Sequence, residues 1–162
     1  MAVPVLDAVA VTLTESDRLV HELPDDYVAQ LLAAIGVPDT SWHIRVDSRL
    51  PLGKGLGSSA AIAVAIARAF NAKCELGLDD ARINDIAFAS EKLAHGTPSG
   101  VDNTLATYAR PMLFRNDGAL EFDESFREAG ASETGVLFDR TLWPHGQAGA
   151  ARPHGAVFSG VR

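Results

Sequence analysis

The residues best suited to chemistry lie in two short stretches of the sequence. The first, residues 51–61, reads PLGKGLGSSAA and is followed by an alanine-rich apolar run. Glycine lets the backbone adopt positive φ and approach a ligand closely. The unpaired N–H groups and partial positive charge at the start of a helix attract anions. We therefore predict that this glycine-rich loop leads into a helix and binds phosphate.

The second stretch, residues 95–103, reads HGTPSGVDN and follows Glu91 by one helical turn. Two glycines and a proline predict a tight loop. A magnesium-nucleotide kinase needs a phosphate-binding loop, oxygen ligands for the metal and a carboxylate near the attacking hydroxyl group. The two stretches supply these groups through Ser58, Ser59, Glu91 and Asp102.

Each of these residues also has a simpler interpretation. The glycines could merely let a helix pack tightly, and Glu91 could be a solvated helix residue paired with His95. His95 is also favourable at a helix C-terminus when it is charged. Asp102 could serve only as a helix cap, and Lys54 could be solvated rather than bound to phosphate. The combination of all these groups favours the kinase site.

A dinucleotide-binding loop is a further alternative. Residues 55–60 fit the G-x-G-x-x-A fingerprint, and Glu75 follows about twenty residues later. In a dinucleotide-binding domain, however, that acidic residue ends a second strand. Glu75 is instead predicted to lie in a turn between two helices. The loop also lacks the Gly-Lys-Ser/Thr ending of a Walker A sequence.

Apolar periodicity predicts the elements that position the two stretches. Strands are expected at residues 5–14, 42–46 and 111–114. Helices are expected at residues 27–35, 59–73 and about 80–95, and a short helix should begin near Asp102. Glu91 should lie at the edge of the apolar face of the third helix, which is formed by Ile83, Ile86, Ala87, Leu93 and Ala94.

Polar side chains and glycines predict where these helices begin and end. Gly36 should end the first helix and Gly96 the third. The expected N-terminal caps are Asp25 or Asp26, Ser58 or Ser59, and Asp79 or Asp80, in the order of the three helices. Asp102 is the expected cap of the short fourth helix.

Composition limits the class of protein. The chain has 162 residues, of which 47% are hydrophobic and 22% charged, as in a globular domain with one core. A net charge of −7 argues against binding to nucleic acid or an anionic membrane surface. The single cysteine, Cys74, allows no internal disulfide and fits the reducing cytoplasm. We expect no signal peptide, and the longest apolar run, residues 60–70, is too short to span a membrane.

The two stretches together resemble those of the GHMP kinases. PxxxGLGSSAA is similar to the phosphate-loop motif of this superfamily, and Glu91 followed by HGTPSGVDN resembles its mevalonate kinase branch. The resemblance extends from about residue 2 to residue 115. It implies an α+β fold, a two-layer sheet-and-helix domain similar to domain 2 of ribosomal protein S5.

The resemblance implies a role for each matching residue. Ser59 and Glu91 would bind Mg²⁺, and Asp102 would be the catalytic aspartate that accepts or orients the proton of the substrate hydroxyl. The implied reaction converts ATP and mevalonate to ADP and 5-phosphomevalonate. The implied substrate-binding residues are His95, Ser99 and Gly100. The implied ATP-binding residues are Pro51, Gly53, Lys54, Gly55, Leu56, Gly57, Ser58, Ser59 and Ala60.

Two parts of the family pattern have no match in the sequence: a first strand and loop that carry a lysine, and a C-terminal domain with a third glycine-rich motif. We expect residues 1–115 to form the N-terminal, ATP-binding domain without its first strand. Residues 116–162 should be a divergent or poorly ordered tail. Loss of one preorganised charge-stabilising group typically costs about 10²–10³ in rate, so we expect low activity from this partial chain.

Two alternatives to a mevalonate kinase stay open at this point. The chain could be an inactive fragment that binds nucleotide or a partner protein, the latter through exposed apolar surface. It could also be another GHMP kinase that acts on a sugar or an isoprenoid precursor. Assembly into a homo-oligomer is compatible with either alternative.

Overall fold

The fold is a mixed domain of helices and short strands, as the sequence predicts. The computed structural model describes residues 8–38, 41–50, 56–114 and 120–122. In chain order the elements are β1 (Val9–Glu15), α1 (Asp25–Ile35), β2 (Trp42–Ser48), α2 (Ser58–Cys74), α3 (Asp80–His95), α4 (Val101–Tyr108), β3 (Met112–Phe114) and β4 (Leu120–Phe122). The pairs β1–β2 and β3–β4 are antiparallel.

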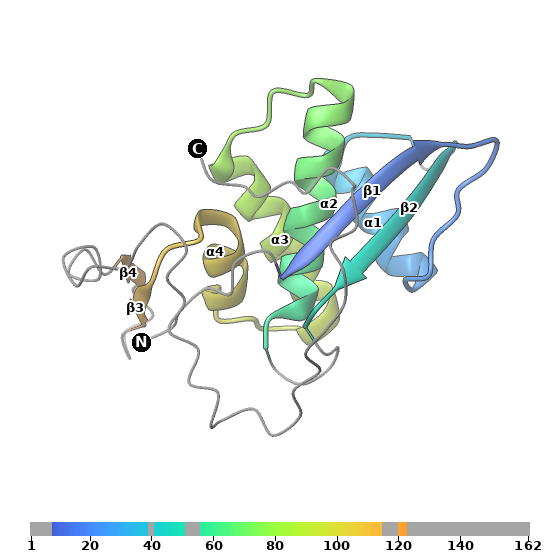
Figure 1. The fold of residues 1–162 in the computed structure, drawn as a ribbon. Coiled ribbons are helices and arrows are strands. Elements are labelled where there is room, and N and C mark those ends of the chain that lie inside the picture. Colours follow the sequence, from blue (N-terminus) through green and yellow to red (C-terminus); the bar gives the residue numbers. More distant parts are fainter. Residues whose placement is uncertain (1–7, 39–40, 51–55, 115–119, 123–162) are drawn as a thin grey trace, which may run out of the picture.

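Helix α2 lies at the centre of the domain (Figure 1). It packs against β1 and β2 and also against α1, α3 and α4. Alanine has the highest helix propensity, which explains why this alanine-rich segment is helical. Ala60, Ala63 and Ala67 are fully buried, and their small side chains let the neighbouring elements come close to α2. The N-terminus of α2 is thereby held between several elements.

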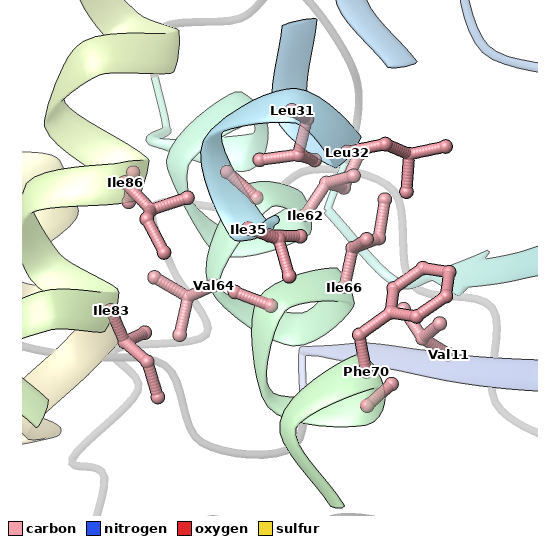
Figure 2. Packing of buried hydrophobic residues seen from close by; sticks show 14 of the residues in the cluster. Val11, Leu31, Leu32, Ile35, Ile62, Val64, Ile66, Phe70, Ile83 and Ile86 are labelled. Carbon is pink, nitrogen blue, oxygen red and sulfur yellow. The ribbon is translucent and has the colours of Figure 1, made fainter. Parts of the chain in front are cut away.

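The hydrophobic core surrounds α2. Figure 2 shows side chains from α1, α2, α3 and β1 meeting in one cluster, which includes Val11, Leu32, Ile66 and Ile86. The predicted four-residue spacing of apolar residues on α2 is confirmed, because Ile62, Ile66 and Phe70 are all buried. Phe70 also makes an edge-to-face contact with Trp42 of β2, with 5.3 Å between ring centroids. Each such buried side chain contributes about 1.5–3 kcal/mol.

The β1–β2 pair has one buried and one wet face. Ile44 of β2 is buried opposite Leu13 of β1, whereas Arg45 and Asp47 are exposed. This confirms the alternation predicted from the sequence. The first strand begins later than predicted, at Val9, and the predicted strand residues 5–7 lie outside the described residues.

The helix ends agree with the sequence only in part. Asp79 caps α3 as predicted, because its Oδ1 accepts a hydrogen bond of 2.8 Å from the N–H of Arg82. Gly36 and Gly96 end α1 and α3 as predicted. The predicted caps of the other three helices are wrong, because the N-cap positions are held by Pro24, Gly57 and Gly100 without a side-chain capping bond.

The side chains predicted to cap α1, α2 and α4 lie one to two positions inside these helices, past the N-cap position. Asp25 and Asp26 belong to the first turn of α1, and Asp102 to the first turn of α4. There a carboxylate interacts favourably with the helix dipole without serving as the cap. Ser58 and Ser59 likewise belong to the first turn of α2.

The apolar face predicted for α3 is correct only in its first half. Ile83, Ile86 and Ala87 are buried, but Leu93 is 63% exposed and Ala94 is also exposed. The helix instead buries Glu91, which is only 3% exposed. At 3.6 residues per turn, Leu93 points about 200° away from Glu91, so burial of one exposes the other.

Strand β4 was not predicted, because it lies in a polar and acidic segment with little apolar periodicity. It lies in the segment 116–162, which was expected to be a divergent or poorly ordered tail. The rest of that segment lies outside the described residues. Within the described ranges, the helices are too short or too polar to cross a membrane.

Candidate active site

The N-terminus of α2 has the properties of an anion-binding site. Gly57 holds the N-cap position with φ 67° and ψ 22°, a left-handed conformation that glycine adopts at little cost. Among the described residues, no side chain caps the helix, and its first turn contains no acidic residue. The first N–H groups of a helix have no partner within the helix. These groups are thus available to an anion such as phosphate.

Asp102 of the second stretch lies directly against this helix end. A Cβ atom added at Gly57 would be 3.1 Å from Cγ and 3.2 Å from Oδ1 of Asp102. In Figure 1 the connection between α3 and α4 passes beside the start of α2. The fold therefore brings the catalytic candidate of one stretch to the phosphate-binding candidate of the other.

The position of Asp102 follows from how α4 is attached. Its neighbour Asn103 is 2% exposed and donates from Nδ2 to Oδ1 of Asn84 on α3, at 2.8 Å. Gly100 begins α4 with φ 82°, and its carbonyl oxygen accepts a 2.6 Å bond from Oγ1 of Thr104. Adjacent residues of a helix point about 100° apart, so Asp102 faces a different side of α4 from Asn103. Asp102 is accordingly exposed and meets the end of α2.

Glu91 is a buried carboxylate on α3, which excludes its interpretation as a solvated helix residue. Among the described residues, its Oε1 has no hydrogen-bond partner. Its Oε2 lies 3.9 Å from Nε2 of His95, whose side chain is 59% exposed. Buried carboxylates normally have a full set of partners or a metal ion. The unpaired oxygen of Glu91 therefore fits a cation.

Tyr27 of α1 contacts the main chain of one candidate metal ligand, Ser59. Its hydroxyl donates a 3.1 Å hydrogen bond to the main-chain carbonyl oxygen of Ser59. Burial raises the pKa of Tyr27 to about 12; the charge of Glu91 adds to this effect, and the nearby Ser90 hydroxyl partly offsets it. Ser90 Oγ itself forms no hydrogen bond with the described residues. The phenol thus remains a donor at neutral pH.

Sequence reasoning missed Tyr27. An aromatic residue in the first turn of an amphipathic helix is typical of a core position. No local signal relates it to a residue more than thirty positions away. Only the packing of α1 against α2 and α3 reveals the contact.

The remaining predicted site residues are placed as follows. Ser58 and Ala60 are buried in the first turn of α2, and Leu56, before Gly57, is 45% exposed. His95 ends α3, and Ser99 is exposed in the following loop, where its Oγ accepts from the N–H of Val101 at 3.4 Å. The residues outside the described ranges are Pro51, Gly53, Lys54 and Gly55.

The dinucleotide-binding alternative is not supported by the fold. Glu75 holds the C-cap position of α2 with φ 52°, in the turn that leads toward α3. This confirms the predicted turn, in which the acidic residue follows a helix rather than a strand. Nor do the described residues contain three or more His, Cys, Asp or Glu side chains grouped for a metal. A metal at this site would need ligands from its substrate.

The family model for the N-terminal domain of GHMP kinases matches residues 22–110, which is more than half of the chain and includes both stretches. The chain belongs to the GHMP kinases. This GHMP kinase chain is 33% identical over 126 residues to a mevalonate kinase of Gibberella zeae, and the aligned region covers 69% of the chain and 25% of that protein. It is 40% identical over 93 residues to the mevalonate kinase of Aeropyrum pernix, and the aligned region covers 56% of the chain and 29% of that protein.

Solved structures agree with this assignment. A crystal structure of L. major mevalonate kinase in complex with R-mevalonate matches the GHMP kinase chain with a TM-score of 0.58 and 27% identity. The match covers 71% of this chain and 42% of that one. The Methanococcus jannaschii mevalonate kinase has the same fold, with a TM-score of 0.60 at 21% identity. The chain spans about a quarter of the length of the curated relatives that it matches.

Proposed function

We propose that this chain provides the ATP-binding and catalytic residues of a kinase that transfers the γ-phosphoryl group of ATP to the hydroxyl of a small alcohol, with mevalonate as the expected acceptor. The observation that supports this proposal best is the contact between Asp102 and the Gly57 position at the start of α2. It brings a carboxylate to the end of a helix that is suited to phosphate. Relatives named mevalonate kinase support the choice of acceptor.

The ATP phosphates would bind at the N-terminus of α2. The N–H groups after Gly57 would donate to phosphate oxygens, since no side chain in the described part of the chain competes for them as a cap. Ser58, Ser59 and Ala60 form this first turn. The loop residues expected to complete the phosphate site are Pro51, Gly53, Lys54, Gly55 and Leu56.

Ser59 and Glu91 would hold the Mg²⁺ ion. The unpartnered Oε1 of Glu91 supports this assignment. Mg²⁺ is usually bound through one or two carboxylates together with substrate phosphates and water, so a cluster of three acidic side chains is not required. When bound, the ion neutralises charge that develops on the transferred phosphoryl group.

Asp102 would accept a hydrogen bond from the acceptor hydroxyl and direct its oxygen toward the γ-phosphorus. As the new O–P bond forms, the bond to the β–γ bridging oxygen breaks and the hydroxyl proton passes to Asp102 or to water. A carboxylate is a weak base, but a loose phosphoryl-transfer transition state needs positioning more than proton abstraction. The residues proposed to face the acceptor are His95 at the end of α3, Ser99 in the following loop and Gly100 at the start of α4.

We also propose a cytoplasmic location, which the lone Cys74 supports because the chain cannot form an internal disulfide. ATP and the small alcohol are the proposed partners. Assembly into a homo-oligomer is compatible with this function.

The test is ADP release by the purified chain with ATP, Mg²⁺ and mevalonate, compared with Asp102→Asn. A sugar and a phosphorylated isoprenoid precursor serve as alternative acceptors. Mevalonate-dependent release that falls at least about 10²-fold in the variant supports the proposal. Release with another acceptor only would refute mevalonate as the substrate. ATP binding without release would refute kinase activity of the chain and leave a nucleotide-binding module.

A further inference from the structure

We propose that Tyr27 is a positioning residue for the metal ligands Ser59 and Glu91. Its hydroxyl would hold the first turn of α2 at a fixed place beside the buried carboxylate, so that both ligands reach the same ion. This inference rests on the proposed function, because it assumes that the two residues bind Mg²⁺.

The first observation is the hydrogen bond itself. The Tyr27 hydroxyl donates to the carbonyl oxygen of Ser59 at 3.1 Å and so joins α1 to the first turn of α2. The acceptor is the main chain of the same residue whose side-chain oxygen is the proposed ligand. The bond therefore restrains the backbone from which the Ser59 hydroxyl projects.

The second observation is the relation between Tyr27 and Glu91. Tyr27 and Glu91 belong to α1 and α3, which pack against each other, and the charge of Glu91 contributes to the raised pKa of Tyr27. The Tyr27 hydroxyl donates to Ser59, and Oε1 of Glu91 has no partner among the described residues. Tyr27 thus leaves this buried oxygen available to a cation.

The third observation is that α1 is a rigid support for this contact. The residues of α1 that follow Tyr27 are buried in the core: Val28, Leu31, Leu32 and Ile35. Groups that orient metal ligands act best when packing fixes their own position. Loss of such an outer partner typically costs about 10–100-fold in metal affinity. For one neutral hydroxyl we expect a value near or slightly below the lower limit, about 5–10-fold.

The experiment is a Mg²⁺ titration of ATP binding to the full chain, followed by calorimetry, for wild type and Tyr27→Phe. The phenylalanine keeps the ring and its packing but removes the donor. We expect the Mg²⁺ midpoint to rise about 5–10-fold, with metal-free ATP binding unchanged. The structural control is Asn71→Ala. Asn71 makes two 2.8 Å bonds to the main chain of Leu78 near the other end of α2, so its loss should lower stability without moving the midpoint.

A third variant separates positioning from a general loosening of the fold. Glu91→Gln removes the charged ligand, and adding Tyr27→Phe to it should cause a smaller further change in Mg²⁺ dependence than in the wild-type background, because Ser59 no longer has to be held in place relative to Glu91. Three results would overturn the inference: an unchanged midpoint in Tyr27→Phe, an equal shift in Asn71→Ala, or the full Tyr27→Phe effect in the Glu91→Gln background.

The outcome for the wild-type chain distinguishes this inference from the proposed function. If wild type shows no Mg²⁺-dependent ATP binding, the proposed function fails and the inference fails with it. If wild type binds ATP in a Mg²⁺-dependent way and Tyr27→Phe matches it, only the role of Tyr27 is refuted.

Discussion

Replacing Gly57 by alanine should affect both the backbone of α2 and the position of Asp102. A residue with a Cβ costs about 1–2 kcal/mol in the left-handed conformation that Gly57 adopts, with φ 67°. The new Cβ would lie 3.1 Å from Cγ of Asp102, so that side chain must move by a few tenths of an ångström. Because Asp102 is exposed, it can turn away at a cost of about 0.5–1.5 kcal/mol.

Gly77 provides a matched control. Its φ is 68°, but no atom lies within 4 Å of the Cβ that alanine would add. Gly77→Ala should therefore cost only the backbone strain, about 1–2 kcal/mol. Gly57→Ala should cost about 1.5–3.5 kcal/mol in free energy of unfolding. The difference between the two variants isolates the contact with Asp102.

Urea denaturation followed by circular dichroism measures both free energies. The ADP-release assay then compares the two variants. We expect Gly57→Ala to lower phosphoryl transfer at least about tenfold, because a small displacement of a positioned group is costly in catalysis, and Gly77→Ala to leave it unchanged. Equal losses of stability and equal activities in the two variants would refute the proposed contact between the helix end and the catalytic carboxylate.

Three further predictions concern stability. Arg68→Ala should lower the free energy of unfolding, measured by urea denaturation, by about 1–3 kcal/mol, because Arg68 donates to the Asp80 carboxylate of α3 at 2.8 Å and to the Thr107 carbonyl of α4 at 2.7 Å. The control Arg45→Ala, at an exposed ion pair, should cost less than about 0.5 kcal/mol. Equal effects of the two substitutions would contradict this prediction. Asn84→Ala should cost about 1–3 kcal/mol by leaving the amide of Asn103 buried without its partner, and a loss below about 0.5 would be evidence against that role. Because burial raises the pKa of Tyr27 to about 12, the unfolded chain releases this proton first, and the free energy of unfolding should fall by roughly 3 kcal/mol as the pH rises from about 10 to 12. Urea denaturation at several pH values should show no such fall in Tyr27→Phe.

The sequence predicted the main elements around the candidate site because their signals are local. The alternating glycines before Ser58 and the alanine-rich run after it predict a loop that leads into a helix, and α2 begins at Ser58. The alternation of apolar and polar residues from Trp42 to Asp47 likewise predicts β2. Gly36 and Gly96 mark helix ends because each adopts positive φ, which other residues avoid.

The remaining features depend on contacts between distant elements. Burial of Glu91 is decided by what packs against the second half of α3, and the predicted stripe of apolar residues favoured Leu93 there instead. The hydrogen bond from Tyr27 to Ser59 joins two helices across the core. Local propensity carries no information on such pairs, and tertiary packing overrides it.

Both stretches should meet at a single metal–nucleotide site beside the start of α2. The most direct measurement is the nuclear magnetic resonance spectrum of the ¹⁵N-labelled chain during addition of ATP with paramagnetic Mn²⁺ in place of Mg²⁺. We predict that the amide signals of Gly57, Ser59, Glu91 and Asp102 broaden first. The signal of Gly77 should persist, since it lies beyond the far end of a helix of 17 residues, about 25 Å away. Uniform broadening, or broadening that begins near Gly77, would contradict a site at the N-terminus of α2.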